Sequence, residues 1–142
     1  MTIVVTSGDP SGIGPEIVQK AWICLKKNPL NEFFWIGDPL HLPDSNIPWQ
    51  QIEHPDQASK VFGDALPILI HKFAHPIKVG QHQPENAADI IKVIKKAVGL
   101  VKTNKAKALC TSPINKNVLM SGANFPYTGH TEFLANLDAI NN

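Results

Sequence analysis

The chain has 142 residues, of which 43% are hydrophobic and 18% are charged, with a formal net charge of +1. This length allows one domain with a hydrophobic core. The near-neutral charge provides no electrostatic footprint for nucleic acid or an anionic membrane, and no apolar stretch approaches the ~20 residues that span a bilayer. No basic segment followed by a long apolar run marks a secretory signal, so we expect a cytoplasmic protein with neither a nucleic-acid nor a membrane partner.

The N-terminal part of the sequence predicts a βαβ unit. Residues 2–7 contain a β-branched run that a glycine ends, which is typical of a buried strand. Residues 8–14 then form a loop, and Pro15 suits the first turn of a helix that reaches about Lys27. A second strand is expected over 33–36. This order favours a sheet that is at least partly parallel.

The middle of the chain, from about residue 40 to residue 83, is rich in proline. Prolines at this density favour turns, irregular segments and short strands. Residues 66–71 and 77–79 are the segments in this region that most favour strands.

Helical periodicity returns after Pro84. Residues 85–104 carry an apolar stripe at helical spacing, with Asp89 near its start and Lys102 near its end, as the helix dipole favours. A short buried strand is expected over 108–110, a short helix over 115–120, and a final helix beginning near His130.

The two cysteines, Cys24 and Cys110, lie among apolar residues in an expected helix and an expected strand. This setting predicts two buried free thiols in a reducing compartment, without a disulfide.

The loop over residues 8–14 (GDPSGIG) joins a strand to the start of a helix, a position that suits anion binding. Its spacing matches neither the dinucleotide fingerprint GxGxxG nor a P-loop with its lysine. A tight structural turn, with Asp9 capping or bracing it, is the alternative interpretation.

A second polar segment, residues 111–116 (TSPINK), follows the end of a predicted strand, where open α/β sheets bind their ligands. Thr111, Ser112, Asn115 and Lys116 offer hydroxyl, amide and ammonium groups that suit a phosphate or a hydroxy acid. A capped loop with a solvated lysine explains the same residues equally well.

His130 is the sharpest single candidate for chemistry, within the segment Thr128-Gly129-His130-Thr131-Glu132. A helix N-terminus favours the neutral imidazole, which can donate to or accept from a substrate oxygen. Thr131 adds a hydroxyl and Glu132 a carboxylate. The alternative is that Thr128 or Thr131 merely caps the helix, with His130 partly exposed. The other histidines show no metal-site spacing.

Three segments, 8–16, 111–116 and 128–135, together resemble the 4-hydroxythreonine-4-phosphate dehydrogenase family in residues, order and separation. The resemblance runs from residue 2 to residue 135. It implies a three-layer α/β/α fold with a mixed, partly parallel sheet, similar to the isocitrate and isopropylmalate dehydrogenases. Residues 1–142 would be the N-terminal part of this two-subdomain fold. The resemblance also implies a homodimer whose active sites lie between subdomains.

The resemblance further implies NAD- or NADP-dependent oxidation of 4-phosphooxy-L-threonine during pyridoxal 5′-phosphate biosynthesis. The product is a 3-keto acid that decarboxylates, and a divalent metal (Zn, Mg or Co) polarises the reacting oxygen. The family's substrate contacts fall on His130 and Thr131, and Asn115 and Lys116 would line the cleft. The resemblance places the family's metal-binding histidines and most of its nucleotide-binding region downstream, so it assigns no cofactor-binding or metal-binding residue within 1–142 and leaves the catalytic residues unknown. We therefore expect the 142-residue chain alone to be inactive.

Two alternatives stay open at the level of sequence. One is a related dehydrogenase acting on another phosphorylated sugar acid, such as threonate phosphate. The other is a truncated, non-catalytic protein that binds a phosphorylated ligand or pairs with a partner subunit. Substrate profiling tests the first, and the reading frame beyond Asn142 in the encoding DNA tests the second.

Overall fold

The computed structural model describes residues 1–140 and contains a five-stranded sheet in the order β3-β4-β2-β1-β5. All four strand pairings are parallel, so the predicted α/β class and parallel pairing are confirmed. The strands are β1 (Ile3–Val5), β2 (Phe33–Gly37), β3 (Trp49–Gln51), β4 (Leu66–Ile70) and β5 (Ala108–Cys110). The helices are α1 (Gly14–Leu25), α2 (Ala58–Val61), α3 (Ala87–Lys102), α4 (Lys116–Ala123) and α5 (His130–Ala139).

Four short 3₁₀ turns connect these elements, and each begins with a proline. Proline suits the first helical position because its missing N–H would have no helical partner there. The turns are Pro29–Asn31, Pro39–His41, Pro55–Gln57 and Pro84–Asn86.

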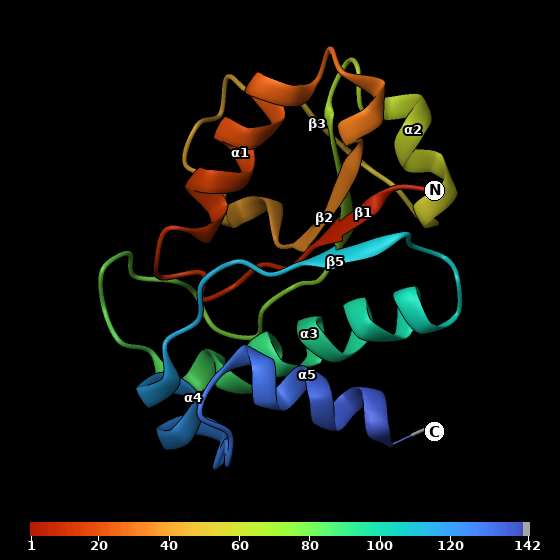
Figure 1. The fold of residues 1–142 in the computed structure, drawn as a ribbon. Coiled ribbons are helices and arrows are strands. Elements are labelled where there is room, and N and C mark those ends of the chain that lie inside the picture. The colour runs from red at the N-terminus through yellow and green to blue at the C-terminus, as the bar shows by residue number, and fades with distance from the viewer. Residues whose placement is uncertain (141–142) are drawn as a thin grey trace.

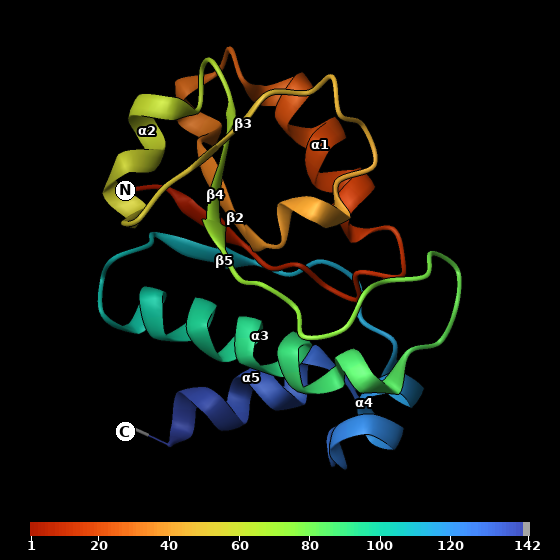
Figure 2. The same cartoon turned by 180° about the vertical axis from the view of Figure 1, so that it is seen from behind.

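Helices cover both faces of the sheet, as Figures 1 and 2 show from opposite sides. Alternation along β2 sends Phe33 and Trp35 into a core with α1, and Phe34 and Ile36 into a core with α2 and α3. All four side chains are buried. The buried run in β2 is therefore explained by a strand that is covered on both faces.

Helix α3 has two apolar sides. Val93 and Ala97 pack toward the sheet, whereas Ile90 and Ile94 pack against α4, α5 and the segment between them. Phe133 of α5 belongs to this second cluster. The start of α5 is thus positioned by α3, which is itself fixed to the sheet.

The order of the strands creates a switch point between β1 and β5. The chain leaves β1 through α1 toward β2, and it leaves β4 through α3 in the opposite direction, to β5. Right-handed crossovers in opposite directions place their helices on opposite faces, as observed. Open α/β sheets bind ligands at the carboxyl ends of the strands beside such a point.

Several local expectations from the sequence were wrong. Residues 77–79 form no strand; instead the Lys78 amide donates to the Gln83 side chain at 2.6 Å. Short strands were expected in the proline-rich region, but neither β3 nor α2 was located, because such short segments carry little periodicity. Helix α4 begins at Lys116 and continues to Ala123, beyond the predicted end.

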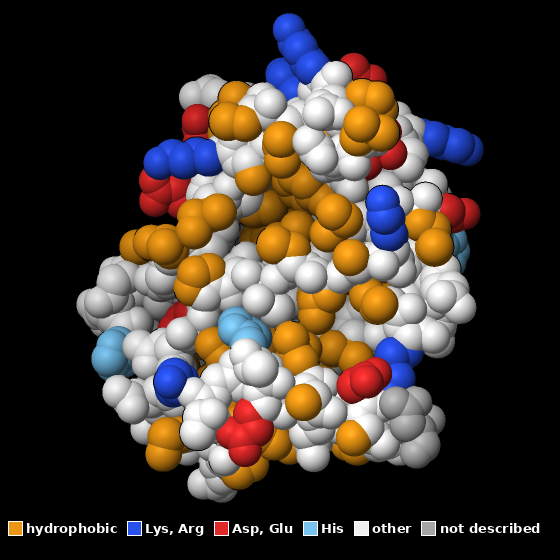
Figure 3. Space-filling view, viewed as in Figure 1, with side chains coloured by type: hydrophobic (Ala, Val, Ile, Leu, Met, Phe, Trp, Pro, Cys, Tyr) orange, Lys and Arg blue, Asp and Glu red, His pale blue; other side chains and the backbone are white. Residues whose placement is uncertain are grey.

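Cys24 and Cys110 are free thiols, as predicted. Both are exposed, so the expectation that they are buried was wrong. Cys24 lies on the outward side of α1, and Cys110 lies in β5, the last strand of the sheet within residues 1–140. Apolar side chains gather on this part of the surface (Figure 3). None of the described helices is long and apolar enough to cross a membrane.

We predict that Trp22→Ala lowers the free energy of unfolding by about 3–5 kcal/mol, the usual cost of truncating a buried aromatic side chain. Trp22 is 1% exposed, and its indole N–H donates to the Phe62 carbonyl at 2.8 Å, so truncation also leaves that carbonyl without its partner. Urea denaturation followed by circular dichroism measures the change. Leu30→Ala, at a side chain that is 84% exposed, is the control, and a loss below about 1 kcal/mol for Trp22→Ala would contradict the packing described.

Candidate functional site

Two loops meet at the switch point, one after β1 and one after β5. The Thr6 amide donates to the Cys110 carbonyl at 3.1 Å, and the Ser112 amide donates to the Thr6 hydroxyl oxygen at 3.0 Å. The Asp9 amide donates to the Pro113 carbonyl at 2.9 Å. Two of the predicted polar segments are therefore joined directly, although about a hundred positions separate them.

Gly8 makes this close approach possible. Its φ is +64°, and a Cβ placed on it would lie 2.5 Å from the Pro113 carbonyl oxygen. Only glycine combines this left-handed backbone with the space that the second loop occupies. The close packing of the second loop therefore explains why glycine is needed at this position of the first loop.

Asp9 braces the turn within the first loop. Its Oδ1 accepts from the Ser11 amide at 2.9 Å, and its carbonyl accepts from the Gly12 amide at 3.0 Å. Burial raises the pKa of Asp9, while the Ser11 hydrogen bond and the charge of His82 oppose that rise. The amides of Asp9, Ser11 and Gly12 all have partners within the protein, which favours a structural turn over an anion-binding loop.

A third segment, residues 76–85, joins the two loops. The Ser11 hydroxyl donates to Gln83 Oε1 at 2.6 Å, and the Gly80 amide donates to the Ser11 carbonyl at 2.8 Å. His82 Nε2 lies 3.0 Å from Asn115 Nδ2. Sequence reasoning missed His82, because a lone histidine in a proline-rich stretch carries no local signal of this placement.

Asn115 and Lys116 begin helix α4. Asn115 Oδ1 accepts from the amides of Asn117 and Val118 at 3.0 and 3.3 Å, so this side chain is the N-cap of the helix. Lys116 is exposed, and a Cβ on Gly129 would lie 3.9 Å from its Cε. Lys116 therefore extends toward the start of α5.

The predicted corner before α5 is held by Glu132. Its Oε2 accepts from both the amide and the hydroxyl of Thr128, each at 2.9 Å, and these bonds lower the pKa of Glu132. This contact resembles a capping box, but the glutamate reaches Thr128, one residue before the N-cap Gly129. The carboxylate of Glu132 therefore has a structural role.

His130 lies at the first position of α5 and is half-buried. Its Nε2 is buried and has no hydrogen-bond partner among the described residues. Burial lowers the pKa of His130, so the imidazole is neutral at neutral pH. Thr131, the next residue, is exposed at the same helix end.

An aromatic cluster fixes the backbone around this corner. Phe125 packs edge-on against Tyr127 and Phe133, with ring centroids 5.1 and 5.0 Å apart. Phe133 is buried and lies one turn after His130. The orientation of the His130 backbone is therefore set by packing of the helix that carries it.

The structure joins the loops after β1 and β5 by hydrogen bonds, and the loop after β5 leads directly into α4. Lys116 and Gly129 link this group to the His130 corner. After the structural bonds are accounted for, the remaining groups are the ammonium of the exposed Lys116, the hydroxyl of the exposed Thr131 and the neutral imidazole of the half-buried His130. These are donors that suit an oxygen-rich anionic ligand.

Comparison with known proteins decides the family. The model of the family described as "Pyridoxal phosphate biosynthetic protein PdxA" matches residues 25–141. The 4-hydroxythreonine-4-phosphate dehydrogenases of Ruegeria sp. (strain TM1040) and Roseobacter denitrificans are 48% and 44% identical over 97% and 93% of this chain. The chain belongs to the PdxA family. It spans 41% and 40% of the lengths of these two relatives.

Solved structures agree with this assignment. The 4-hydroxythreonine-4-phosphate dehydrogenase from Burkholderia phymatum matches with a TM-score of 0.85 and 29% identity, over 97% of this chain and 43% of that one. The Klebsiella pneumoniae enzyme matches with a TM-score of 0.78 and 27% identity, over 96% and 44%. A terephthalate 1,2-cis-dihydrodiol dehydrogenase from Burkholderia xenovorans LB400 shares the fold, with a TM-score of 0.67 at 17% identity.

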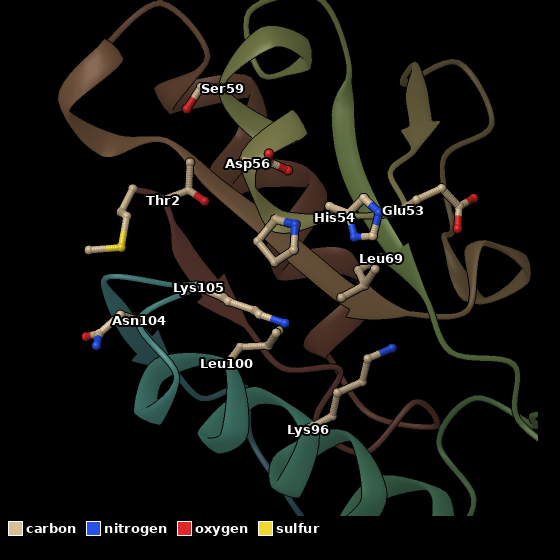
Figure 4. A pocket seen from close by; sticks show the side chains of 12 residues that line it. Thr2, Glu53, His54, Asp56, Ser59, Leu69, Lys96, Leu100, Asn104 and Lys105 are labelled. Carbon is tan, nitrogen blue, oxygen red and sulfur yellow. The ribbon is translucent and has the colours of Figure 1, made fainter.

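A cavity of about 620 Å³ lies away from the PdxA-type segments, between α2, α3 and the start of β1 (Figure 4). Lys96 and Lys105 extend toward it from one side and His54 from the other. None of the site residues described above lines this cavity. The loops at the carboxyl ends of β1 and β5 are the better candidate, because two of the three segments that carry the family resemblance lie there.

We predict that Gly8→Ala lowers the free energy of unfolding by about 1–3 kcal/mol or more, because it forces a left-handed residue and a clash with Pro113. Gly63→Ala is the matched control, since a Cβ there meets no atom within 4 Å. Denaturant titration of both variants measures the difference. Equal stability of the two would refute the close approach of the loops.

We also predict that His130 titrates below the ordinary histidine value of 6.5. Because the folded-state pKa is depressed, the stability associated with neutral His130 is full above 6.5 and is lost as the pH falls toward the folded pKa. NMR titration of the imidazole, assigned by its disappearance in His130→Asn, measures the pKa. The same variant should weaken the dependence of unfolding free energy on pH below 6.5; a pKa at or above 6.5 contradicts the prediction.

Proposed function

We propose that this chain is the N-terminal portion of a 4-hydroxythreonine-4-phosphate dehydrogenase and supplies the substrate-contacting side of its active site. Membership of the PdxA family and the names of the relatives support this. The observation that carries the proposal is the His130 corner, where a neutral imidazole with an unpartnered, buried Nε2 begins a helix beside Thr131. We propose that this nitrogen, which has no partner among residues 1–140, bonds to a substrate oxygen.

In this proposal the complete enzyme oxidises 4-phosphooxy-L-threonine. The secondary hydroxyl loses its proton while the carbon that bears it transfers a hydride to NAD⁺ or NADP⁺, and the resulting 3-keto acid then loses carbon dioxide. The reaction belongs to pyridoxal phosphate biosynthesis, with which the family description agrees. We place the enzyme in the cytoplasm as a homodimer.

The site residues divide into substrate contacts and supports. His130 and Thr131 contact the substrate through the imidazole and the hydroxyl. Lys116 lines the cleft beside Gly129, where its charge favours the phosphate. Asn115 lines the cleft through its Nδ2, while its Oδ1 caps α4 and so positions Lys116.

The residues of this chain do not fit a metal centre by themselves. No group of three His, Cys, Asp or Glu side chains within residues 1–140 is placed to hold a metal ion. The loop over 8–14 likewise uses three of its amides internally. In our proposal the divalent metal (Zn, Mg or Co) and the nicotinamide cofactor are therefore held by the part of the family fold outside this chain, and the chain alone has no turnover.

The proposal is tested by joining the 142-residue chain in frame to the part of the Ruegeria relative that lies beyond the matched region. We expect NAD(P)-dependent oxidation of 4-phosphooxy-L-threonine by the fusion and none by the 142-residue chain. In the fusion, His130→Asn should lower kcat/KM about 100-fold or more, because it removes a donor at the reacting substrate. Thr131→Val should have a smaller effect in the same direction.

Thr103→Val is the control, because the Thr103 hydroxyl bonds to the Gly99 carbonyl within α3, away from the site. Turnover by the 142-residue chain, or an unchanged kcat/KM in His130→Asn, would overturn the proposal. Threonate phosphate offered as a competing substrate tests the related-dehydrogenase alternative in the same assay.

A further inference from the structure

The cavity between α2, α3 and the start of β1 has the size and composition of a small-molecule site (Figure 4). Its volume of about 620 Å³ falls within the range that is usual for ligand pockets, roughly 300–1,000 Å³. Leu69 of β4 and Leu100 of α3 give it an apolar part, and charged and polar side chains surround them. A ligand pocket typically combines an apolar lining with a few polar groups in this way.

The end of α3 and the turn after it form one wall of the cavity. Lys96 and Leu100 are four residues apart, so they lie on the same side of the helix. Asn104 follows with a left-handed φ of 55°. The Leu100 carbonyl accepts from the amides of Lys105 and Ala106 at 2.8 and 3.1 Å, which ends the helix and turns the chain back beside it. Lys96 and Lys105 therefore extend toward the cavity from the same wall (Figure 4).

The segment that leads into α2 forms the opposite wall. Gln57 Oε1 accepts from the amides of Glu53 and His54 at 2.7 and 3.1 Å, which fixes the backbone that carries His54. Figure 4 shows His54 across the cavity from the two lysines, whereas the Glu53 carboxylate points away from it. That carboxylate accepts from the Gln51 side chain at 2.7 Å. Asp56 is then the acidic side chain of the lining that is left to face the lysines.

The charges around the cavity favour an anionic ligand. Lys96 and Lys105 bring two ammonium groups to one wall, and neither forms an ion pair within residues 1–140. With Glu53 engaged elsewhere, the carboxylate of Asp56 offsets one of these two charges. A phosphate suits such a wall better than a carboxylate does, because its extra charge and its three oxygens can serve both lysines.

Thr2 provides an independent sign of a missing ligand group. It lines the cavity and is 3% exposed, yet its hydroxyl oxygen is buried without a hydrogen-bond partner among residues 1–140. Its backbone is held in place, because the Thr2 carbonyl accepts from the Lys107 amide at 2.8 Å. Most buried hydroxyl groups in proteins have a partner, which is either a protein group, an ordered water or a ligand. A ligand in the cavity would supply one.

We infer that this cavity binds a small phosphate monoester with an apolar body. The phosphate lies between Lys96 and Lys105, and the apolar body lies against Leu69 and Leu100. The Thr2 hydroxyl bonds to a ligand oxygen, directly or through one water. The cavity shares no lining residue with the His130 corner or the loops after β1 and β5. The inference therefore concerns a second site and does not rest on the proposed dehydrogenase function.

Phenyl phosphate is a suitable probe, because it joins a phosphate to an apolar ring. Titration into the ¹⁵N-labelled 142-residue chain measures the Kd, and the amide shifts locate the site. We expect saturable binding with the largest shifts at Thr2 and over residues 53–59 and 96–105. Inorganic phosphate and phenol, which each carry one half of the probe, should bind about tenfold more weakly or less, because each loses the charged or the apolar contact.

Helix α3 offers a matched pair of variants. Lys96→Gln should weaken binding of phenyl phosphate about fivefold or more, and Lys105→Gln should do the same, because each removes a charge-assisted hydrogen bond. Lys95→Gln removes the same charge from the next position of α3. Its side chain lies in a different hollow, beside Tyr127 and Asn136, so binding should be unchanged.

Thr2→Val tests the buried hydroxyl. This variant keeps the shape of the side chain and removes an oxygen that has no partner among the described residues of the free chain. It should weaken binding of phenyl phosphate without lowering the free energy of unfolding, which denaturant titration measures. A role of the hydroxyl in the folded chain alone would give the opposite pattern, with lower stability and unchanged binding.

Four results would overturn the inference: no saturable binding, equal affinities for phenyl phosphate and inorganic phosphate, equal effects of Lys96→Gln and Lys95→Gln, or loss of binding in Lys116→Gln. The last would move the ligand to the His130 corner. Loss of binding in the fusion to the Ruegeria relative would also overturn it, since the remaining part of the fold would then fill the cavity. Binding is measured without turnover, so its failure is distinguishable from failure of the dehydrogenase proposal.

Discussion

The pairing of β1 with β5 is the constraint on which the site depends. These strands lie at opposite ends of the chain, and their register places Val5 beside Cys110. The loops that follow are then joined by the hydrogen bonds of Thr6 with Ser112 and of Asp9 with Pro113. Gly8 is required because no side chain fits between them. The start of α4, and through Lys116 its contact with the α5 corner, inherits its position from this junction.

Many of the polar side chains in the three segments form hydrogen bonds that hold the backbone in place. Asp9 braces its turn, Asn115 caps α4, and Glu132 binds Thr128. Each of these residues satisfies amide donors that would otherwise lack partners. This division leaves His130 Nε2 without a hydrogen-bond partner among residues 1–140, near the exposed side chains of Thr131 and Lys116. These three side chains offer mainly hydrogen-bond donors, and the carboxylates of Asp9 and Glu132 already accept hydrogen bonds within the protein. Such a group is electrostatically suited to a phosphorylated substrate.

The sequence predicted those helices, strands and turns that are specified by the residues within them. The β-branched run before Gly8, the apolar stripe of α3 and the polar start of α5 each carry their own periodicity or capping pattern. Burial of Cys110 could not be read in this way, because it depends on which strand lies at the edge of the sheet. The placement of His82 depends on the hydrogen bond between Ser11 and Gln83, which are 72 positions apart. Nothing near residue 82 encodes that partner.

Burial of side chains decreases across the sheet from β4 to β5, so the residues that stabilise the chain and the loops that carry the candidate site lie at different ends of the sheet. From β4 through β2 to β1, side chains such as Leu66, Phe34 and Val4 are fully buried, so the cores on both sides are complete within the chain. Cover fails only toward β5, on the α1 side. The switch point between β1 and β5, where open α/β sheets bind their ligands, lies at the same end of the sheet. The same strand order therefore closes the core around β4 and β2 and places the joined polar loops after β1 and β5 where cover of the sheet is least.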